Sequence, residues 1–333
     1  SGREGFVEVI IARQHRSFLA GVIRIPSITV VSSAVGAFSD GDSNTSSLIA
    51  LDPGNTCGSG RTHGTGDIRI YPAVAGTAGG YVHVNSVCQS GTTDTLCLND
   101  SQGALTVGGT STLTAPHTYV SGSCKSNGTG LYGPLSEGAV QIVDPLLSLP
   151  PPALADYPAG QCGPSGIVTA PTGPNSGGCV FNDAAVITLQ PGVYYGGWDI
   201  KKNGATLELA PGIYILAGGG IKLTSGGSIT SVQGGTGGPA PVMIFNTDNP
   251  ATRTGQANID FNAQATLALR GLESGPYRGM VVWNDGNGSN PQALIDLKGQ
   301  SALDISGTIY SPKGLVNLEG GGTTTSTASV QII

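Results

Sequence analysis

Apolar residues in this chain occur in short runs separated by turns rich in Gly, Ser and Asn. Many of the runs alternate apolar and polar positions, as in TLAL at 266–269 and ALDI at 302–305. Alternation with a period of two is typical of strands with one buried face, and almost no stretch has the 3.6-residue period of a helix. The pattern therefore predicts an all-β protein.

A repeat of about twenty residues organises the second half of the chain. The motif PGVYYGG at 191–197 returns as PGIY at 211–214, and a glycine triplet follows at 218–220. Each unit of strands and glycine turns is too short to bury its apolar face alone, so neighbouring units must stack. We predict a right-handed parallel β-helix (β-solenoid); an antiparallel sandwich, with longer strands at wider intervals, is the alternative.

The pattern divides the chain into an N-terminal β-rich arm, residues 1–38, and a β-helix, residues 39–333. A Pro-rich excursion interrupts the β-helix at about 144–180, because a proline run cannot continue a central strand. In the arm, a short helix over 10–19 is the alternative to strands. The apolar arm residues are candidates for assembly: Phe6, Val7, Val9, Ile11, Val22, Ile23, Ile25, Ile28 and Val30.

Composition excludes two classes of protein. Of 333 residues, 54 are Gly and 21 are Pro, but 38% are hydrophobic and only 11% are charged, which is unlike a disordered chain. The net charge is −6, and the only adjacent basic pair is Lys201-Lys202. Nucleic-acid binding would need a basic stripe, so we expect no nucleic-acid partner.

Six cysteines predict disulfides and an oxidising, extracellular setting, because none has the C-x-x-C spacing of a zinc or redox site. Proximity in sequence favours the pairs Cys88–Cys97 and Cys162–Cys179, which leaves Cys57–Cys124. The apolar stretch 18–38 is too interrupted to span a bilayer. The sequence starts at Ser1, so we expect a processed, secreted form.

The residues that could carry chemistry are few. Asp260, Asp296 and Asp304 are the candidates for a polysaccharide lyase or hydrolase, but alternation predicts that they point outward beside inward Leu and Ile. The four histidines are isolated, and we expect no cofactor and no catalytic activity. Calcium is a weak candidate at two acidic turns, through Asp40, Asp42, Asp285 and Asn287, although turns use the same residues for backbone reasons.

Three tyrosines in Gly-x-Tyr triplets, Tyr194, Tyr214 and Tyr310, are predicted to stack along the solenoid. A sugar-binding platform made of Tyr195 and Trp198 is the weaker alternative.

Several segments resemble the TadG-like proteins of the Flp/Tad pilus machinery. They include LQPGVYYGGWDI, LELAPGIYILAGGGIKL, IVDPLLSLPPP and the closing VQII, and the similarity spans nearly the whole chain. Its motifs are turn and coil patterns, not catalytic signatures, and the membrane helix usual at the start of the family is missing here. The resemblance implies a surface-exposed or secreted bacterial protein that is pilus-linked or adhesive.

We therefore expect an extracellular structural or adhesive protein at the bacterial cell surface. Its expected partners are other copies of itself, with cell-surface or polysaccharide ligands as further candidates. A solenoid has two open ends, and the sequence closes on a strand at 330–333. The arm could add strands to a neighbouring copy and build a head-to-tail filament, or it could pack along its own solenoid. A carbohydrate-binding or carbohydrate-cleaving β-helix is the alternative function.

Overall fold

The fold is taken from a computed structural model. It describes residues 6–16, 27–37, 46–62, 67–70, 81–89, 103–108, 112–126, 130–163, 168–169, 177–223, 226–233, 239–252, 254–261, 266–290, 293–299, 302–314, 316–320 and 327–332. Among these residues no helix is long and apolar enough to cross a membrane. Strands dominate, and the short 3-10 helix η2 (Leu154–Asp156) is the exception.

The chain forms two compact units, and the smaller one contains an antiparallel hairpin. Strands β1 (Phe6–Arg16) and β2 (Ser27–Ala37) pair along their whole lengths, from Phe6 opposite Ala37 to Arg16 opposite Ser27. β-branched residues are frequent in both strands, which favours the extended backbone. Strand β1 covers residues 10–16, so the helix considered there does not form.

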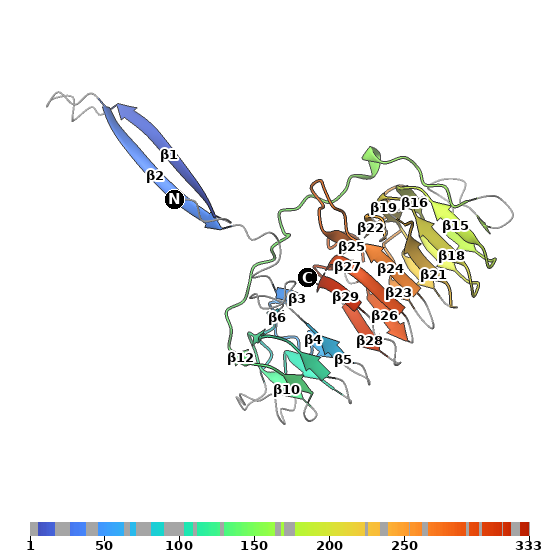
Figure 1. Ribbon diagram of the computed structural model, residues 1–333, viewed down its shortest axis with the longest axis horizontal. Coiled ribbons are helices and arrows are strands. Elements are labelled where there is room, and N and C mark those ends of the chain that lie inside the picture. Colours follow the sequence, from blue (N-terminus) through green and yellow to red (C-terminus); the bar gives the residue numbers. More distant parts are fainter. Residues whose placement is uncertain are drawn as a thin grey trace. The chain divides into compact units, whose positions relative to one another are not determined.

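The larger unit is a solenoid-like stack of parallel strands (Figure 1). Its largest sheet has 14 strands among the described residues, ten of them in one row. In spatial order the row is β12 (Leu135–Glu137), β9 (Thr118–Val120), β6 (Tyr81–Val84), β3 (Ser46–Ala50), β29 (Thr327–Ile332), β27 (Ala302–Tyr310), β24 (Thr266–Arg270), β21 (Ser228–Ser231), β18 (Thr206–Leu209) and β15 (Val186–Leu189).

The other four strands of this sheet form a second row that joins β27. They are β16 (Gly192–Tyr195), β19 (Gly212–Ala217), β22 (Val242–Thr247) and β25 (Met280–Asn284). A seven-stranded sheet contains β13 (Val168–Thr169), β14 (Cys179–Phe181), β17 (Trp198–Ile200), β20 (Ile221–Leu223), β23 (Ile259–Phe261), β26 (Ile295–Gly299) and β28 (Val316–Gly320). Two three-stranded sheets complete the unit: β10 (Cys124–Ser126), β7 (Leu105–Val107) and β4 (Gly60–Thr62), and β11 (Leu131–Tyr132), β8 (Thr112–Thr114) and β5 (Asp67–Arg69).

The order of coils in the stack differs from the order in the chain. The later half, from β14 to β29, winds toward the middle of the stack, where Ile332 of β29 pairs with Leu48 of β3. The earlier half, from β3 to β12, continues from there. The last strand thus has a partner on each side, β27 and β3. The predicted open end of the solenoid at 330–333 is therefore wrong.

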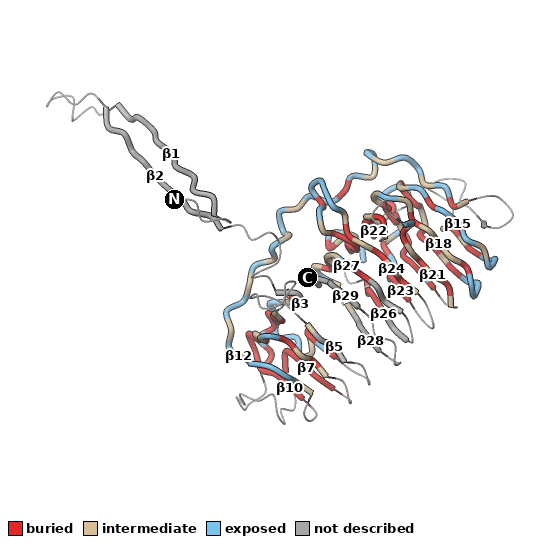
Figure 2. Tube along the Cα trace, in the orientation of Figure 1, coloured by how far each residue is buried: buried red, intermediate tan, exposed pale blue. Residues whose placement is uncertain are grey.

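A long segment returns the chain from the end of the early half to the start of the late half (Figure 1). We call residues 138–163 the strap. Its prolines, including Pro150–Pro152, cannot donate ladder hydrogen bonds, and residues 139–156 contain no strand. The excursion predicted to about residue 180 also includes the strands β13 and β14. Figure 2 shows the strap as a mostly exposed or half-buried trace beside the buried strands of the stack.

Apolar side chains fill the inside of both halves of the stack. Phe181, Leu207 and Leu223 are among the residues of the late-half core, and Val82 and Leu105 belong to that of the early half; all are 2% exposed or less. The core strands alternate inward apolar and outward polar residues, as in Thr266–Arg270. This alternation is the reason that each coil needs a neighbour to complete its core.

The glycine pairs of the repeat mark corners where successive coils touch backbone to backbone. A Cβ on Gly219 would lie 2.2 Å from the carbonyl carbon of Gly196, and one on Gly178 would lie 2.2 Å from the oxygen of Gly196. Gly197 also has a φ of +70°. Only glycine fits such corners, and this explains why the pairs recur with the repeat.

The disulfides correct part of the predicted pairing. Cys162–Cys179 forms as predicted, with Cα atoms 5.6 Å apart. Cys57 pairs with Cys88, with Cα atoms 5.1 Å apart, so the predicted pairs Cys57–Cys124 and Cys88–Cys97 are wrong. Cys124 is disulfide-bonded as well, and Cys97 lies outside the described residues. Sequence proximity failed because stacking brings Cys88 beside an earlier coil.

Candidate functional site

An apolar column runs along the outer face of the second row of strands. Val193, Ile215, Phe245, Trp283 and Tyr310 are in register on β16, β19, β22, β25 and β27, and each is 4% exposed or less. The rings of Phe245 and Tyr310 both contact Trp283, with centroids 5.3 and 5.4 Å away. The strands that carry this column are therefore apolar on both faces.

The strap covers this column. Leu146, Leu149, Leu154 and Tyr157 of the strap pack against the cluster that contains the column. This explains the continuous burial of Val242–Thr247 and Met280–Asn284, where an exposed strand would alternate. The Pro-rich segment is therefore the outer wall of a second core.

Hydrogen bonds hold the start of the strap against the early half of the stack. The side-chain amide of Asn85 donates to the carbonyl of Ile142 (2.7 Å) and accepts from its N–H (2.9 Å). The side-chain amide of Gln141 donates to the carbonyls of Pro53 (3.0 Å) and Asn85 (2.8 Å). The Asn85 side chain thus bonds both backbone groups of Ile142, as a neighbouring strand would. These bonds fix the position of the strap along the early half.

Two residues further along, one short contact ties the strap to the late half. The hydroxyl of Tyr310 donates to Oδ2 of Asp144 at 2.6 Å, and Oδ1 of Asp144 accepts from the N–H of Leu146 at 2.8 Å. Burial, and then the hydrogen bond and charge of Asp144, raise the pKa of Tyr310 above its ordinary value. The folded protein therefore holds the Tyr310 hydroxyl in its neutral, protonated form.

The far end of the strap extends the second row past β16. Ala159 forms a parallel bridge with Val193, the N–H of Val193 donates to the carbonyl of Pro158 (2.8 Å), and that of Gly160 donates to the carbonyl of Val193 (2.8 Å). The disulfide Cys162–Cys179 follows directly. The strap therefore covers the edge that β16 would otherwise present.

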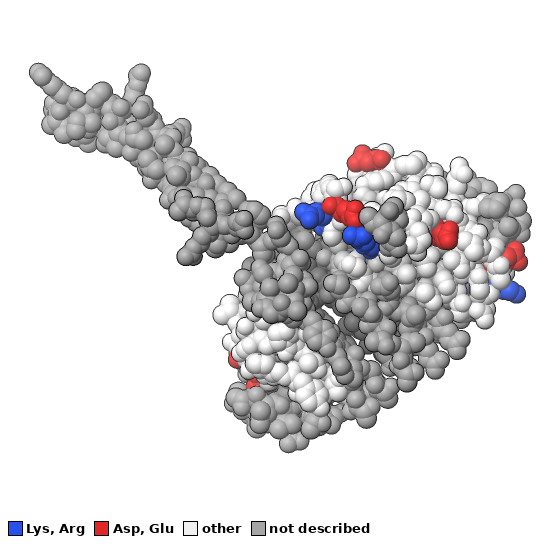
Figure 3. All heavy atoms as spheres, in the orientation of Figure 1, with Lys and Arg blue, Asp and Glu red and all other residues white. Residues whose placement is uncertain are grey.

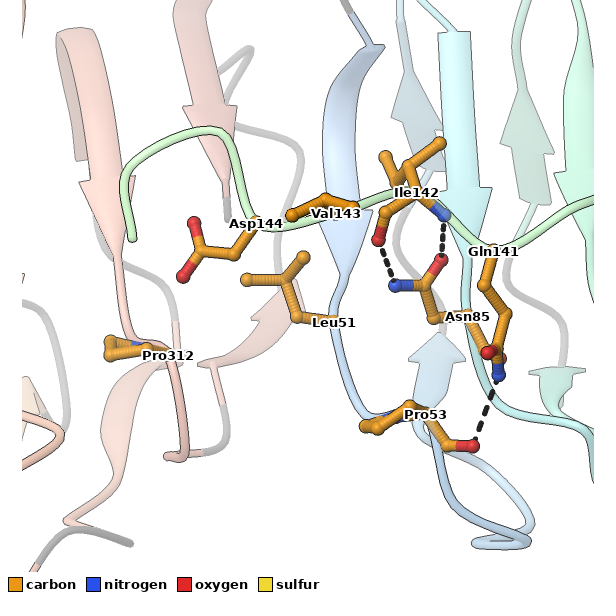
Figure 4. Close-up of a pocket in the computed structure, with 8 residues that line it drawn as sticks. All are labelled: Leu51, Pro53, Asn85, Gln141, Ile142, Val143, Asp144 and Pro312. Carbon is orange, nitrogen blue, oxygen red and sulfur yellow. Dashed lines mark hydrogen bonds between the residues drawn. The ribbon is translucent and has the colours of Figure 1, made fainter. Parts of the chain in front are cut away.

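A cavity of about 390 Å³ lies between the strap and the junction of the two halves (Figure 4). It is lined by Leu51, Pro53, Asn85, Gln141, Ile142, Val143, Asp144 and Pro312. The polar groups of Asn85 and Asp144 are already hydrogen-bonded to the strap or to Tyr310. This cavity is an open hollow beside the strap. Its polar groups attach the strap to the stack.

A histidine lies under the first residues of the strap. His83 is 6% exposed, and its ring stacks at 5.9 Å on Tyr119, which also stacks at 4.2 Å on His117. Burial lowers the pKa of His83, and a hydrogen bond with the backbone of Val140 opposes that shift. His83 therefore packs as a neutral ring against the strap.

Two of the three candidate catalytic carboxylates are neighbours. Asp260 and Asp296 are in register on β23 and β26, where parallel strands lie about 4.8 Å apart. Asp260 lies between buried Ile259 and Phe261, as alternation predicts, but Asp296 is only 4% exposed. Asp304 is on β27, in a different sheet. The three positions therefore do not share one face.

The calcium candidates are divided between described and undescribed residues. Asp40 and Asp42 lie outside the described residues. Asp285 accepts from the hydroxyl of Thr247 (2.7 Å) and from the N–H of Asn287 (2.9 Å), one bond for each oxygen. Asp285 thus closes a turn, and no group of three His, Cys, Asp or Glu suited to a metal occurs in the described part of the chain.

The tyrosine prediction is right in part. Tyr194 and Tyr214 stack inside the late half, with ring centroids 6.0 Å apart, although Tyr194 is in register with Leu216. Tyr310 belongs instead to the outer column. Trp198 is 2% exposed and packs against both stacked rings, so the proposed sugar platform is wrong.

The predicted assembly residues lie on the hairpin or beyond the described residues. Val22, Ile23 and Ile25 are outside the described ranges, and Phe6 is at the start of β1. Register places the remaining five, Val7, Val9, Ile11, Ile28 and Val30, on one face of the hairpin. On the larger unit, the charged groups of the described surface in Figure 3 are few and scattered.

The sequence analysis did not predict that the strap covers the second row of strands. The signals were present in the runs VMIF at 242–245 and MVVW at 280–283, which lack alternation and so indicate burial on both faces. No family model, curated protein or solved structure matches the chain.

Proposed function

We propose that this protein is a non-enzymatic structural or adhesive protein of the bacterial cell surface, which associates with copies of itself through the N-terminal hairpin. The hairpin carries the proposal. Its two 11-residue strands belong to the smaller compact unit, and register places five large apolar residues, with Arg13 and His15, on one face. A two-stranded hairpin is marginally stable alone in water, so it needs a surface to cover that face.

The architecture of the larger unit supports a structural role. Parallel strands stack into a β-helix, and we propose right-handed winding, because parallel crossover connections are right-handed in about 98% of cases. Two disulfides between described cysteines support secretion into an oxidising compartment. The resemblance to TadG-like proteins supports a pilus-linked setting.

The association that we propose is head to tail. The hairpin of one copy contacts a different surface on the next copy, and a contact of this kind remains open for further copies and can extend into a filament. The hairpin offers apolar residues and two outer strand edges that pair with no other strand among the described residues, which suits strand addition. The expected partner is therefore a second copy of this chain.

The double substitution Val9→Asp and Ile11→Asp tests the role of the hairpin in the full chain. We expect the unsubstituted protein to form oligomers that grow with concentration in sedimentation velocity, and the variant to stay monomeric with an unchanged circular dichroism spectrum. A monomeric unsubstituted protein at high concentration would refute self-association. An unaffected double variant would show that the hairpin is not the contact.

A carbohydrate-cleaving function is the second candidate, and the neighbouring Asp260 and Asp296 favour it. They are in register on adjacent parallel strands, and retaining glycosidases hold two carboxyl groups close together, at roughly 5–5.5 Å. The 4% exposure of Asp296 opposes it, because a polysaccharide could not reach that side chain. Activity on acidic polysaccharides that disappears in Asp260→Asn would overturn the structural proposal in favour of this one.

A further inference from the structure

The outer face of the strap carries an apolar row that the solenoid does not use. Val140, Val143 and Leu147 are 86%, 80% and 73% exposed, and they are three of the six large hydrophobic residues exposed in the described part of the chain. They lie within eight residues of one another. Val143 also lines the hollow beside the strap (Figure 4). We call these three residues the strap row.

The inner face of the strap is already occupied, so the row has a different role. Ile142 and Leu146 alternate with the row and pack against the outer apolar column, while Asp144 between them binds Tyr310. A segment that served only as a cover would have polar residues on its outer face. Apolar residues on both faces indicate that a second surface covers the strap from outside.

The N-terminal hairpin has the chemistry to be that surface. Register puts five apolar residues on one face of the hairpin together with Arg13 and His15, and the arm is the basic part of an acidic chain. Residues 1–38 contain four Arg and two Glu, a net charge of +2 in a protein of −6. The strap contains no Lys or Arg; of its two carboxylates, Asp144 binds Tyr310 on the inner side and Asp156 is exposed. The hairpin and the strap are therefore opposite in net charge, and both carry apolar residues.

We infer that the strap row is the surface on which the hairpin of a second copy docks. This inference rests on the proposed self-association and names the face of the neighbour that takes part. The strap then has two functions: its inner face seals the apolar column, and its outer face receives the next copy. Because hairpin and strap are different surfaces, each copy can both give and receive a hairpin.

The test compares three full-length variants by sedimentation velocity over a concentration series. The strap variant carries Val143→Asp and Leu147→Asp, and the hairpin variant carries Val9→Asp and Ile11→Asp. Val186→Asp is the matched control, because Val186 is a 65% exposed apolar residue on β15, away from the strap. All three positions in the solenoid are exposed, so we expect their circular dichroism spectra and melting temperatures to match the unsubstituted protein.

We expect the strap and hairpin variants each to weaken self-association by about 100-fold or more, and the control to leave it unchanged. An equimolar mixture of the two variants is the decisive sample. The intact hairpin of one can dock on the intact strap of the other, so the mixture should form 1:1 dimers and nothing larger.

Other outcomes overturn the inference in distinguishable ways. If the strap variant still associates while the hairpin variant is monomeric, the proposed function stands and the strap row is wrong. If Val186→Asp abolishes association, the ends of the stack are the contact. If the mixture stays monomeric while the unsubstituted protein associates, the hairpin and the strap row are not each other's partners. If the unsubstituted protein is monomeric, both proposals fail.

Discussion

At the scale of single residues, the spacing between coils depends on glycines that have no room for a side chain. Gly178, Gly196 and Gly219 lie at the same corner of successive coils, where a Cβ would meet backbone atoms of the neighbour at about 2.2 to 2.4 Å. Backbone atoms cannot move aside as a flexible side chain can. The repeat of Gly pairs is thus a packing requirement of the stack.

Gly219→Ala should destabilise the protein by about 1–3 kcal/mol, because the new methyl group forces two coils apart. Gly177→Ala is the matched control, since a Cβ there would meet nothing within 4 Å and Gly177 does not have a positive φ. Urea unfolding of both variants measures the difference. Equal stability of the two would show that the corner is not close-packed.

At the scale of elements, the strap makes one folded unit out of segments distant in the sequence. It is anchored near its start by Asn85 of the early half and Tyr310 of the late half, and at its far end by the Cys162–Cys179 disulfide. The proline run explains its extended course, but its inner leucines explain its stability. Losing one anchor should loosen the strap before it unfolds the stack.

Replacing Cys162 and Cys179 together by serine should lower the free energy of unfolding by about 3 kcal/mol, as for a loop of similar length; 17 residues separate the two cysteines. We also expect faster amide exchange in residues 157–163 than in β19 or β22. Removal of Cys57 and Cys88 is the comparison, because that bond lies in the other half. Unchanged exchange at 157–163 would contradict an anchoring role.

At the scale of the whole molecule, three buried tyrosines make the fold sensitive to alkaline pH. Burial raises the pKa of Tyr194, Tyr214 and Tyr310 above the ordinary value of 10.0. Above pH 10 the unfolded chain loses these protons while the folded protein keeps them. The stability that the neutral phenols contribute is complete below pH 10 and is lost as pH rises above it.

The free energy of unfolding should therefore fall above pH 10, by up to about 1.4 kcal/mol per pH unit for each tyrosine. Urea unfolding between about pH 8 and 11 measures the slope. Tyr310→Phe removes one of the three groups and should make the slope shallower, whereas Tyr132→Phe, at a 49% exposed position, should not. A flat profile would contradict the burial of these hydroxyl groups.

Local patterns in the sequence were enough to predict strands that stack in parallel. The alternation in Thr266–Arg270 reflects contacts within one strand, and the PG-x-Y repeat reflects contacts between neighbouring coils. Contacts over such short distances in the sequence produce a periodic pattern. The Cys162–Cys179 bond was predictable for the same reason, since its partners are close in sequence.

Only the tertiary structure decided which distant segments meet. The pairing of β29 with β3, the Cys57–Cys88 bond and the Tyr310–Asp144 contact each depend on how whole coils stack. Contacts between distant segments produce no periodic pattern in the sequence, because they depend on the shape and burial of coils that have already formed. The sequence by itself thus determined a parallel β-stack. The tertiary structure decided that the last strand of the late half pairs with the first strand of the early half, and that the strap covers the second row of strands.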